Sequence, residues 1–203
     1  MIGMVDYGMG NLRSVEKALE RAGGKVIRLS DAAGLHGIDR LVVPGQGAFR
    51  DFVAHLESSG LREGILAWLK ADRPFLGICL GQQALFETSY ENGEHRGLGF
   101  FSGTVDRLDA QGLKIPQIGW NQVRFAKPAC PLFENITDGT YFYFDHSFCP
   151  HPANDDIVAG KTEYGETFAS VVWRRNCFAV QFHPEKSQRA GIQMLSNFVS
   201  LKI

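Results

Sequence analysis

Cys79, which has a glycine two residues before it and another two residues after it, is a candidate nucleophile. Gly77-Ile78-Cys79-Leu80-Gly81 follows an apolar run and precedes a helix-forming stretch. A nucleophile at a sharp strand-to-helix turn needs small neighbours, because its backbone is strained and crowded. The free N–H groups at the helix start favour a thiolate and can bind an oxyanion. A buried structural cysteine is the simpler alternative, but strand, glycines and helix together favour Cys79 as a nucleophile.

A base for this sulfur is predicted where an apolar run over 178–182 leads into His183-Pro184-Glu185. Pro184 should keep His183 extended, so that Glu185 lies on the same side of the chain and accepts the imidazole N–H. His146 is a rival base, but its neighbour Asp145 faces the opposite side of a strand and cannot orient it. We therefore predict His183 as the base and Glu185 as its orienting carboxylate.

A glycine-rich turn after a third apolar run is a candidate source of backbone N–H groups. Pro44-Gly45-Gln46-Gly47 follows the predicted strand 41–43. Such a turn can direct an N–H toward developing negative charge, although it can also be merely a tight turn.

The elements that position these residues follow from hydrophobic periodicity. Strands are predicted at 2–5, 26–29, 41–43 and 75–78, and helices at 11–22 and 61–70. Aromatic and β-branched runs predict further strands at 141–144, 168–173 and 178–182, before a closing helix at 191–199. This alternation predicts an α/β fold, an open and mostly parallel twisted sheet flanked by helices, with extra antiparallel strands in the second half. We expect one domain over 1–203.

Composition excludes several classes of function. The 203 residues carry 21 Lys and Arg against 22 Asp and Glu, a net charge of −1 that gives no field for nucleic acid or anionic membrane. The sequence has neither a secretory leader pattern nor an apolar run long enough to cross a bilayer, so we expect a cytoplasmic protein. Cysteines at 79, 130, 149 and 177 form no close pairs, and neither a disulfide framework nor a zinc site is expected.

Together, the elbow, the glycine turn and the His-Pro-Glu segment resemble the class I (triad) glutamine amidotransferases, whose fold is flavodoxin-like. The chain also resembles, within that class, the glutaminase subunits of imidazole glycerol phosphate synthase. Seven motifs, spread over nearly the whole chain, carry this resemblance: Asp6-Tyr7-Gly8-Met9-Gly10-Asn11-Leu12, Pro44-Gly45-Gln46-Gly47-Ala48-Phe49, Gly77-Ile78-Cys79-Leu80-Gly81-Gln82-Gln83, Gly97-Leu98-Gly99, Gly119-Trp120-Asn121, His146-Ser147 and Gln181-Phe182-His183-Pro184-Glu185-Lys186-Ser187. The elbow and His-Pro-Glu occur in all triad amidotransferases, whereas the first and the Gly-Trp-Asn motif are more specific.

The resemblance implies a role for each matching residue. Cys79 would attack the glutamine amide, His183 would transfer protons and Glu185 would orient His183. The other implied roles are oxyanion binding by Leu80, Gly45 and Gln46, glutamine binding by Gln83, Ser147 and Phe148, and partner contact by Asn11, Trp120 and Lys186. No cofactor or metal is implied. Gln46, Asp145 and Phe148-Cys149 depart from the residues common in the family.

The resemblance also implies a partner. In this family the glutaminase forms a heterodimer with a (β/α)8-barrel cyclase, to which it supplies ammonia. The cyclase converts the phosphoribulosyl intermediate PRFAR to imidazole glycerol phosphate and AICAR in histidine biosynthesis.

Alternative functions lack some of these motifs. The glutaminase of pyridoxal phosphate synthesis shares the triad but not the first motif or Gly-Trp-Asn, and a non-catalytic glutamine-binding regulator would not need an intact triad. Gly8-Met9-Gly10 with Asp31 resembles part of a dinucleotide site, but Arg13 replaces the third glycine.

Overall fold

The computed structural model describes residues 1–8 and 11–202, and its centre is a mixed sheet of eight strands. The sheet order is β2-β1-β3-β4-β14-β13-β12-β9, parallel from β2 to β14 and antiparallel beyond. Its strands are β1 (Ile2–Val5), β2 (Val26–Leu29), β3 (Arg40–Gly45), β4 (Phe75–Cys79), β14 (Cys177–Val180), β13 (Glu166–Arg174), β12 (Val158–Tyr164) and β9 (Arg124–Phe125). The predicted sheet, mostly parallel with antiparallel strands from the second half, is confirmed.

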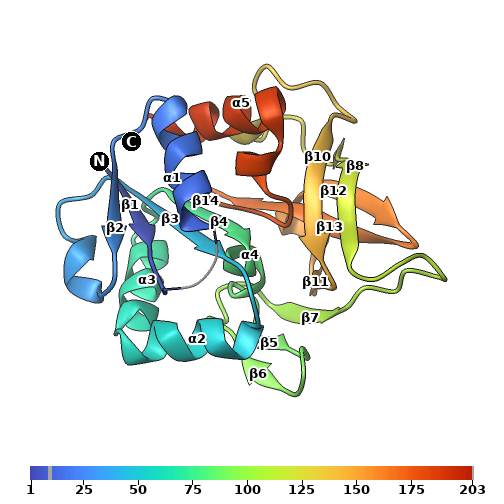
Figure 1. The fold of residues 1–203 in the computed structure, drawn as a ribbon, viewed down its shortest axis with the longest axis horizontal. Helices are drawn as coiled ribbons and strands as arrows, with labels where there is room; N and C mark the ends of the chain where they lie inside the picture. The colour runs from blue at the N-terminus through green and yellow to red at the C-terminus, as the bar shows by residue number, and fades with distance from the viewer. Residues whose placement is uncertain (9–10, 203) are drawn as a thin grey trace.

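Helices cover both faces of the parallel part of this sheet (Figure 1). On one face α1 (Leu12–Arg21) packs against α5 (Gln188–Val199), and on the other α2 (Phe49–Ser58) packs against α3 (Leu61–Lys70). Helix α2 is absent from the prediction, although its buried residues Phe49, Phe52, Val53 and Leu56 follow helical spacing. Among residues 1–8 and 11–202, no helix has the length and apolar character needed to span a membrane.

The shorter elements connect and extend this framework. They are the helix α4 (Leu80–Gln83) and the 3-10 turns η1 (Ala32–Leu35), η2 (Pro131–Phe133), η3 (Asp155–Ile157) and η4 (Pro184–Lys186).

Two smaller sheets lie beside the antiparallel end of the central sheet (Figure 1). One is a ribbon of β8 (Gln117–Gln122) and β10 (Tyr141–His146), and the other has the order β11-β7-β5-β6, with β11 (Phe148–Pro152), β7 (Gly103–Arg107), β5 (Thr88–Ser89) and β6 (His95–Arg96). Alternation along β10 buries Phe142, Phe144 and His146 and leaves Tyr141 exposed. The ribbon therefore has one face in the core and one toward solvent.

Strand register brings the predicted site residues to one edge of the central sheet. Gly45 on β3 lies opposite Cys79 on β4, and Val180 on β14 lies opposite Ile78. The carboxyl ends of neighbouring parallel strands are where α/β sheets bind ligands. The glycine turn, the cysteine and the segment that leads to His183 therefore meet at this edge.

Glycines at the cysteine turn allow backbones to approach closely. A Cβ added to Gly81 would lie 1.8 Å from the carbonyl oxygen of Val43, and one added to Gly77 would lie 2.4 Å from the carbonyl oxygen of Gly81. Both obstacles are backbone atoms, which cannot rotate away. The turn therefore requires glycine at both positions.

We expect Gly81→Ala to lower the free energy of unfolding by at least about 2 kcal/mol, because the methyl group would force α4 away from Val43 on β3. Gly64→Ala is the matched control, since Gly64 lies in helix α3 and its added Cβ meets the flexible end of the Leu35 side chain in η1. This variant should change stability by no more than about 1 kcal/mol. Urea unfolding followed by circular dichroism measures both. Equal stability of the two variants would contradict this account of the turn.

Candidate active site

Cys79 occupies a strained turn between β4 and α4, beside a cavity of about 400 Å³. Its backbone has φ 54° and ψ −108°, a region that residues other than glycine rarely adopt and that is typical of functional sites. The helix that follows, α4, has only four residues, so its dipole is small. Its contribution to the environment of the Cys79 sulfur lies in the free N–H groups at its start. Cys79 is 5% exposed and lines the cavity.

His183 and Glu185 form a buried pair at the end of β14. Nδ1 of His183 lies 2.8 Å from Oε1 of Glu185, and the two side chains are 2% and 1% exposed. The expectation of an extended chain from His183 to Glu185 is wrong: His183 is extended, but Pro184–Lys186 is a 3-10 turn. Proline suits the first position of such a turn because it lacks an N–H and has a fixed φ. The carboxylate reaches the ring across this turn.

The Cys79 sulfur and the Glu185 carboxylate together set the protonation of His183. Burial lowers the pKa of His183, but the neighbouring Cys79 sulfur and the Glu185 carboxylate outweigh burial and raise that pKa above its ordinary value. Nε2 of His183 is buried and has no hydrogen-bond partner within the described residues. This nitrogen is therefore available to exchange a proton with a group at the cavity.

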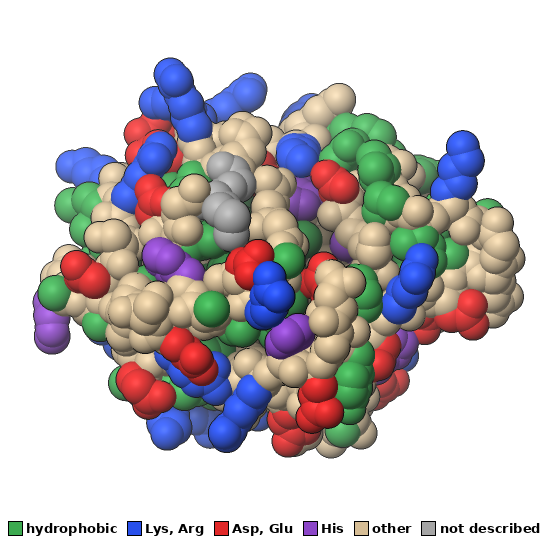
Figure 2. Space-filling model, turned by 60° about the horizontal axis from the view of Figure 1, so that its bottom comes forward, with side chains coloured by type: hydrophobic (Ala, Val, Ile, Leu, Met, Phe, Trp, Pro, Cys, Tyr) green, Lys and Arg blue, Asp and Glu red, His purple; other side chains and the backbone are tan. Residues whose placement is uncertain are grey.

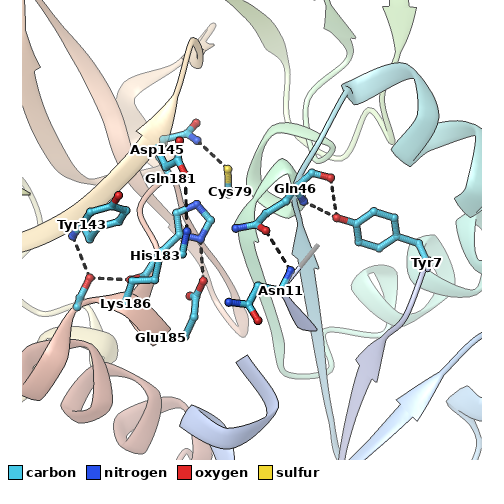
Figure 3. A network of polar contacts seen from close by, with 11 residues as sticks. Tyr7, Asn11, Gln46, Cys79, Tyr143, Asp145, Gln181, His183, Glu185 and Lys186 are labelled. Atoms are coloured by element: carbon cyan, nitrogen blue, oxygen red, sulfur yellow. Dashed lines mark hydrogen bonds and ion pairs between the residues drawn. The ribbon is translucent and has the colours of Figure 1, made fainter. Parts of the chain in front are cut away.

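Gln181 contacts the sulfur directly and was not among the predicted site residues. Its Nε2 donates to Sγ of Cys79 at 3.6 Å (Figure 3). Its Oε1 accepts from Nε2 of Gln83 at 3.1 Å. The pairing of Val180 with Ile78 places Gln181 level with Cys79 on the next strand. Only this register reveals the contact, because 102 positions separate the two residues.

The backbone N–H of Gln46, a predicted oxyanion donor, already makes a hydrogen bond in this conformation. Its N–H donates to the hydroxyl of Tyr7, which in turn donates to the carbonyl oxygen of Gln46 at 2.8 Å (Figure 3). Burial raises the pKa of Tyr7 to about 12, so this hydroxyl keeps its proton. Asn11 N–H binds Oε1 of Gln46 at 3.1 Å. Contrary to expectation, the backbone N–H of Gln46 is not free to bind an oxyanion here.

The remaining predicted substrate residues line the cavity. Nε2 of Gln83 donates to the carbonyl oxygen of Phe148 at 2.9 Å, and its buried Oε1 has no partner in the part of the chain that the structure describes. The cavity residues are Gln46, Gly47, Cys79, Leu80, Gln83, Glu91, Pro116, Asp145, His146, Ser147, Phe148 and Lys186. Gly45 instead lines a small adjoining pocket with Asn11, His183 and Glu185.

The three predicted partner-contact residues surround this site. Lys186 pairs with Asp145 at 3.6 Å, and its ammonium lies 5.4 Å from the centre of the Tyr143 ring. Trp120, 44% exposed, packs edge-on against Tyr143 as well. Asn11 lies across the site, beside Gln46 (Figure 3). On the face drawn in Figure 2, basic side chains are interspersed with acidic ones, as the near-neutral composition predicts.

The other cysteines differ from Cys79 in their surroundings. All four are free and buried. Burial raises the pKa of the Cys130 thiol to about 12 and also raises the pKa values of Cys149 and Cys177, so these three carry their protons. The dinucleotide motif considered above includes residues 9 and 10, which lie outside the described residues.

Comparison with known proteins identifies the family of the chain. The family model described as Glutamine amidotransferase class-I matches residues 4–201, and the chain belongs to this family. It is 47% identical to the imidazole glycerol phosphate synthase subunit HisH of Syntrophotalea carbinolica, over 98% of each chain. The HisH subunit of Dechloromonas aromatica is 51% identical over 98% of this chain and 95% of its own. The resemblance to the glutaminase subunits of that synthase is confirmed.

Solved structures support the fold alone, because their sequences have diverged. A structure described as a glutamine amidotransferase has a TM-score of 0.74 at 17% identity and covers 96% of this chain and 98% of its own. A Trypanosoma brucei CTPS glutaminase domain has a TM-score of 0.70 at 16% identity, over 98% and 90%. The chain therefore has the class I amidotransferase fold.

His146, the rejected base, is held neutral beside the cavity. Its Nδ1 lies 2.9 Å from the carbonyl oxygen of Phe148, and its Nε2 lies 2.9 Å from Oε1 of Gln117. Burial lowers the pKa of His146 from 6.5 to about 4. A neutral ring donates one hydrogen bond and accepts another, so the Gln117 amide must present its NH₂ group to Nε2.

We expect the free energy of unfolding to fall by up to about 3 kcal/mol between pH 6.5 and pH 4, because the unfolded chain takes up a proton that folded His146 resists. The raised pKa of His183 acts in the opposite direction, but only near pH 6.5, where the unfolded ring is still about half neutral; well below that pH the ring is protonated in both states and adds no slope. His146→Gln should lose markedly less stability over the same range. Urea titrations at several pH values measure this, and parallel losses in both proteins would contradict the assignment.

Proposed function

We propose that this chain is the glutaminase subunit of imidazole glycerol phosphate synthase, hydrolysing L-glutamine to glutamate and ammonia for use by a cyclase subunit. The observation that carries the proposal is the buried His183–Glu185 pair at the cavity that Cys79 lines. Glu185 raises the proton affinity of the His183 ring, and Cys79 occupies a strained turn. The identity to HisH proteins over nearly the whole chain supports the same function. This function requires no metal or cofactor.

The reaction proceeds through a thioester. Sγ of Cys79, deprotonated by Nε2 of His183, attacks the side-chain amide carbon of glutamine and forms a tetrahedral intermediate. His183 returns the proton to the amide nitrogen, the C–N bond breaks and ammonia leaves. Water then attacks the glutamyl thioester while His183 accepts its proton. The C–S bond breaks, glutamate leaves and the sulfur regains its proton from His183.

Neighbouring residues prepare the nucleophile and base for these steps. Glu185 fixes the ring tautomer by accepting from Nδ1–H and stabilises the imidazolium that forms. The amide of Gln181 holds the sulfur in place and stabilises its negative charge. The N–H of Leu80, the first residue of α4, is the proposed oxyanion donor beside the sulfur. A second donor comes from Gly45 or Gln46 once the bond to Tyr7 breaks.

The cavity suits a free amino acid. Its volume of about 400 Å³ accommodates glutamine, and its charged lining consists of Glu91, Asp145 and Lys186. Lys186 pairs with Asp145, whereas Glu91 accepts a backbone hydrogen bond from Phe49 through Oε2 and is in no ion pair of the described residues, so its carboxylate is the one proposed to bind the α-ammonium group of the substrate. Oε1 of Gln83 and the backbone at Ser147 and Phe148 provide further hydrogen-bonding groups.

The proposed partner is a (β/α)8-barrel cyclase that covers the site. Ile118, Trp120 and Tyr141 form an exposed apolar surface on the β8–β10 ribbon, beside Lys186 and Tyr143. Exposed aromatic side chains with a neighbouring cation are typical of protein interfaces. A partner docked there and at Asn11 would cover the cavity, and ammonia released at Cys79 would not be lost to solvent.

We expect Cys79→Ala to lower glutaminase turnover at least about a thousandfold while the protein stays folded and still binds the cyclase. Glu185→Gln keeps the geometry and should cause a smaller loss. Cys130→Ala, which changes another buried cysteine, serves as the control and should retain activity. Glutamate release measures turnover, and full activity in Cys79→Ala would overturn the mechanism.

Affinity purification with identification of the bound protein separates a histidine-pathway cyclase from a pyridoxal phosphate synthase.

We expect Tyr7→Phe to raise glutaminase activity of the isolated chain about two- to tenfold, because it removes the hydroxyl that occupies the N–H of Gln46. Phe keeps the packing against Phe52, whose ring centre lies 5.1 Å away. Tyr164→Phe is the matched control, since it also removes one hydroxyl bond to a backbone carbonyl and should leave activity unchanged. Measurements without the cyclase isolate this effect, and unchanged or lower activity in Tyr7→Phe would show that the bond does not restrain the site.

A further inference from the structure

Three metal-ligating side chains converge outside the cavity, where β11 meets β13. Sγ of Cys149 lies 3.6 Å from Nε2 of His151, which follows it by two residues on β11 and therefore shares its face. Glu166, at the start of β13, places Oε1 3.8 Å from that sulfur and Oε2 3.9 Å from that nitrogen. All three donor atoms lie within 4.8 Å of one another.

The separations of the donor atoms are close to the edges of a zinc coordination tetrahedron. With a Zn–S bond of about 2.3 Å and Zn–N or Zn–O bonds of about 2.1 Å, tetrahedral angles separate neighbouring donors by about 3.4–3.6 Å. The sulfur-to-nitrogen distance of 3.6 Å equals such an edge, whereas the sulfur and the nitrogen each lie nearest to a different oxygen of Glu166, at 3.8 and 3.9 Å. One oxygen, the sulfur and the nitrogen lie within 4.8 Å of one another, so rotation of the Glu166 carboxylate is needed to bring a single oxygen to the same ion.

The surroundings of the cluster also suit a cation. The backbone N–H of Asp109 donates to Oε1 of Glu166 at 2.7 Å, an outer hydrogen bond of the kind that orients metal-binding carboxylates. Asp106 is the cross-strand neighbour of Cys149 and adds a second carboxylate nearby. The buried sulfur forms the inner side of the cluster, whereas the His151 and Glu166 side chains are 37% and 21% exposed. An ion can reach the site from solvent.

We propose that Cys149, His151 and Glu166 form a binding site for Zn²⁺, with water as the fourth ligand. One sulfur, one nitrogen and one oxygen donor suit zinc, whereas magnesium and calcium prefer oxygen ligands alone. The thiol proton passes to solvent as the Zn–S bond forms. The ion joins β11, whose first residue Phe148 lines the glutamine cavity, to the β12–β13 hairpin. Zinc at this site would stabilise the strand that supports one wall of the cavity.

Zinc titration of the full-length chain tests the site. Because Cys79 and His183 are a second cysteine–histidine pair, the titrations use Cys79→Ala protein, stripped with a chelator and competed against a chromophoric zinc indicator. We expect one zinc ion per chain. Adding His151→Ala or Glu166→Gln should weaken binding at least about tenfold, and adding Cys149→Ala should weaken it further. Cobalt in place of zinc should give a thiolate-to-metal absorption band that Cys149→Ala removes.

Matched controls separate this site from other zinc-binding groups. His36→Ala removes an exposed histidine and Cys130→Ala a buried cysteine, both outside the cluster, and neither should change zinc affinity. Since the His151 side chain is partly exposed, His151→Ala tests the site even where Cys149→Ala fails to fold. Absence of binding to the Cys79→Ala protein, or binding that none of the three ligand variants weakens, would overturn the proposal.

Discussion

The close approach of backbones around Cys79 is the constraint on which the rest of the site depends. β3 and β4 are adjacent in the sheet, and α4 must begin directly at the end of β4 while passing within contact of Val43. That approach is possible only with glycine at 77 and 81, and it forces Cys79 into a strained conformation. The strain is tolerated because the sheet and the surrounding core hold both ends of the turn. The buried sulfur thereby lines the cavity.

Around that sulfur, buried polar groups compensate one another. His183 keeps a high proton affinity in a buried position because Cys79 and Glu185 offset the cost of burial. Amide groups of Gln83 and Gln181 continue the network to the sulfur, and the Tyr7 hydroxyl accepts from the backbone N–H of Gln46. A site with one donor already occupied is consistent with a subunit whose activity depends on its partner, since ammonia released without a cyclase is wasted.

The second half of the chain adds the cavity wall and the outer surface. The β8–β10 ribbon buries phenylalanines on one face and exposes Trp120 and Tyr141 on the other, so that one element both closes the core and carries the proposed docking surface. The next strand, β11, places Phe148 at the cavity and Cys149 and His151 near Glu166. The proposed zinc site and the glutamine cavity therefore share a strand without sharing a ligand.

The amino-acid sequence by itself determined what local pattern and motif can encode. Periodicity located β1, β2 and α3 at their observed bounds, and the motifs around Cys79 and His183 identified the family, because strand alternation, helix spacing and glycine requirements act over a few residues. Only the tertiary structure decided the contacts of Gln181 with Cys79, of Tyr7 with Gln46 and of Glu166 with Cys149. Each joins segments distant along the chain, and the register of strands that brings them together depends on packing across the whole sheet.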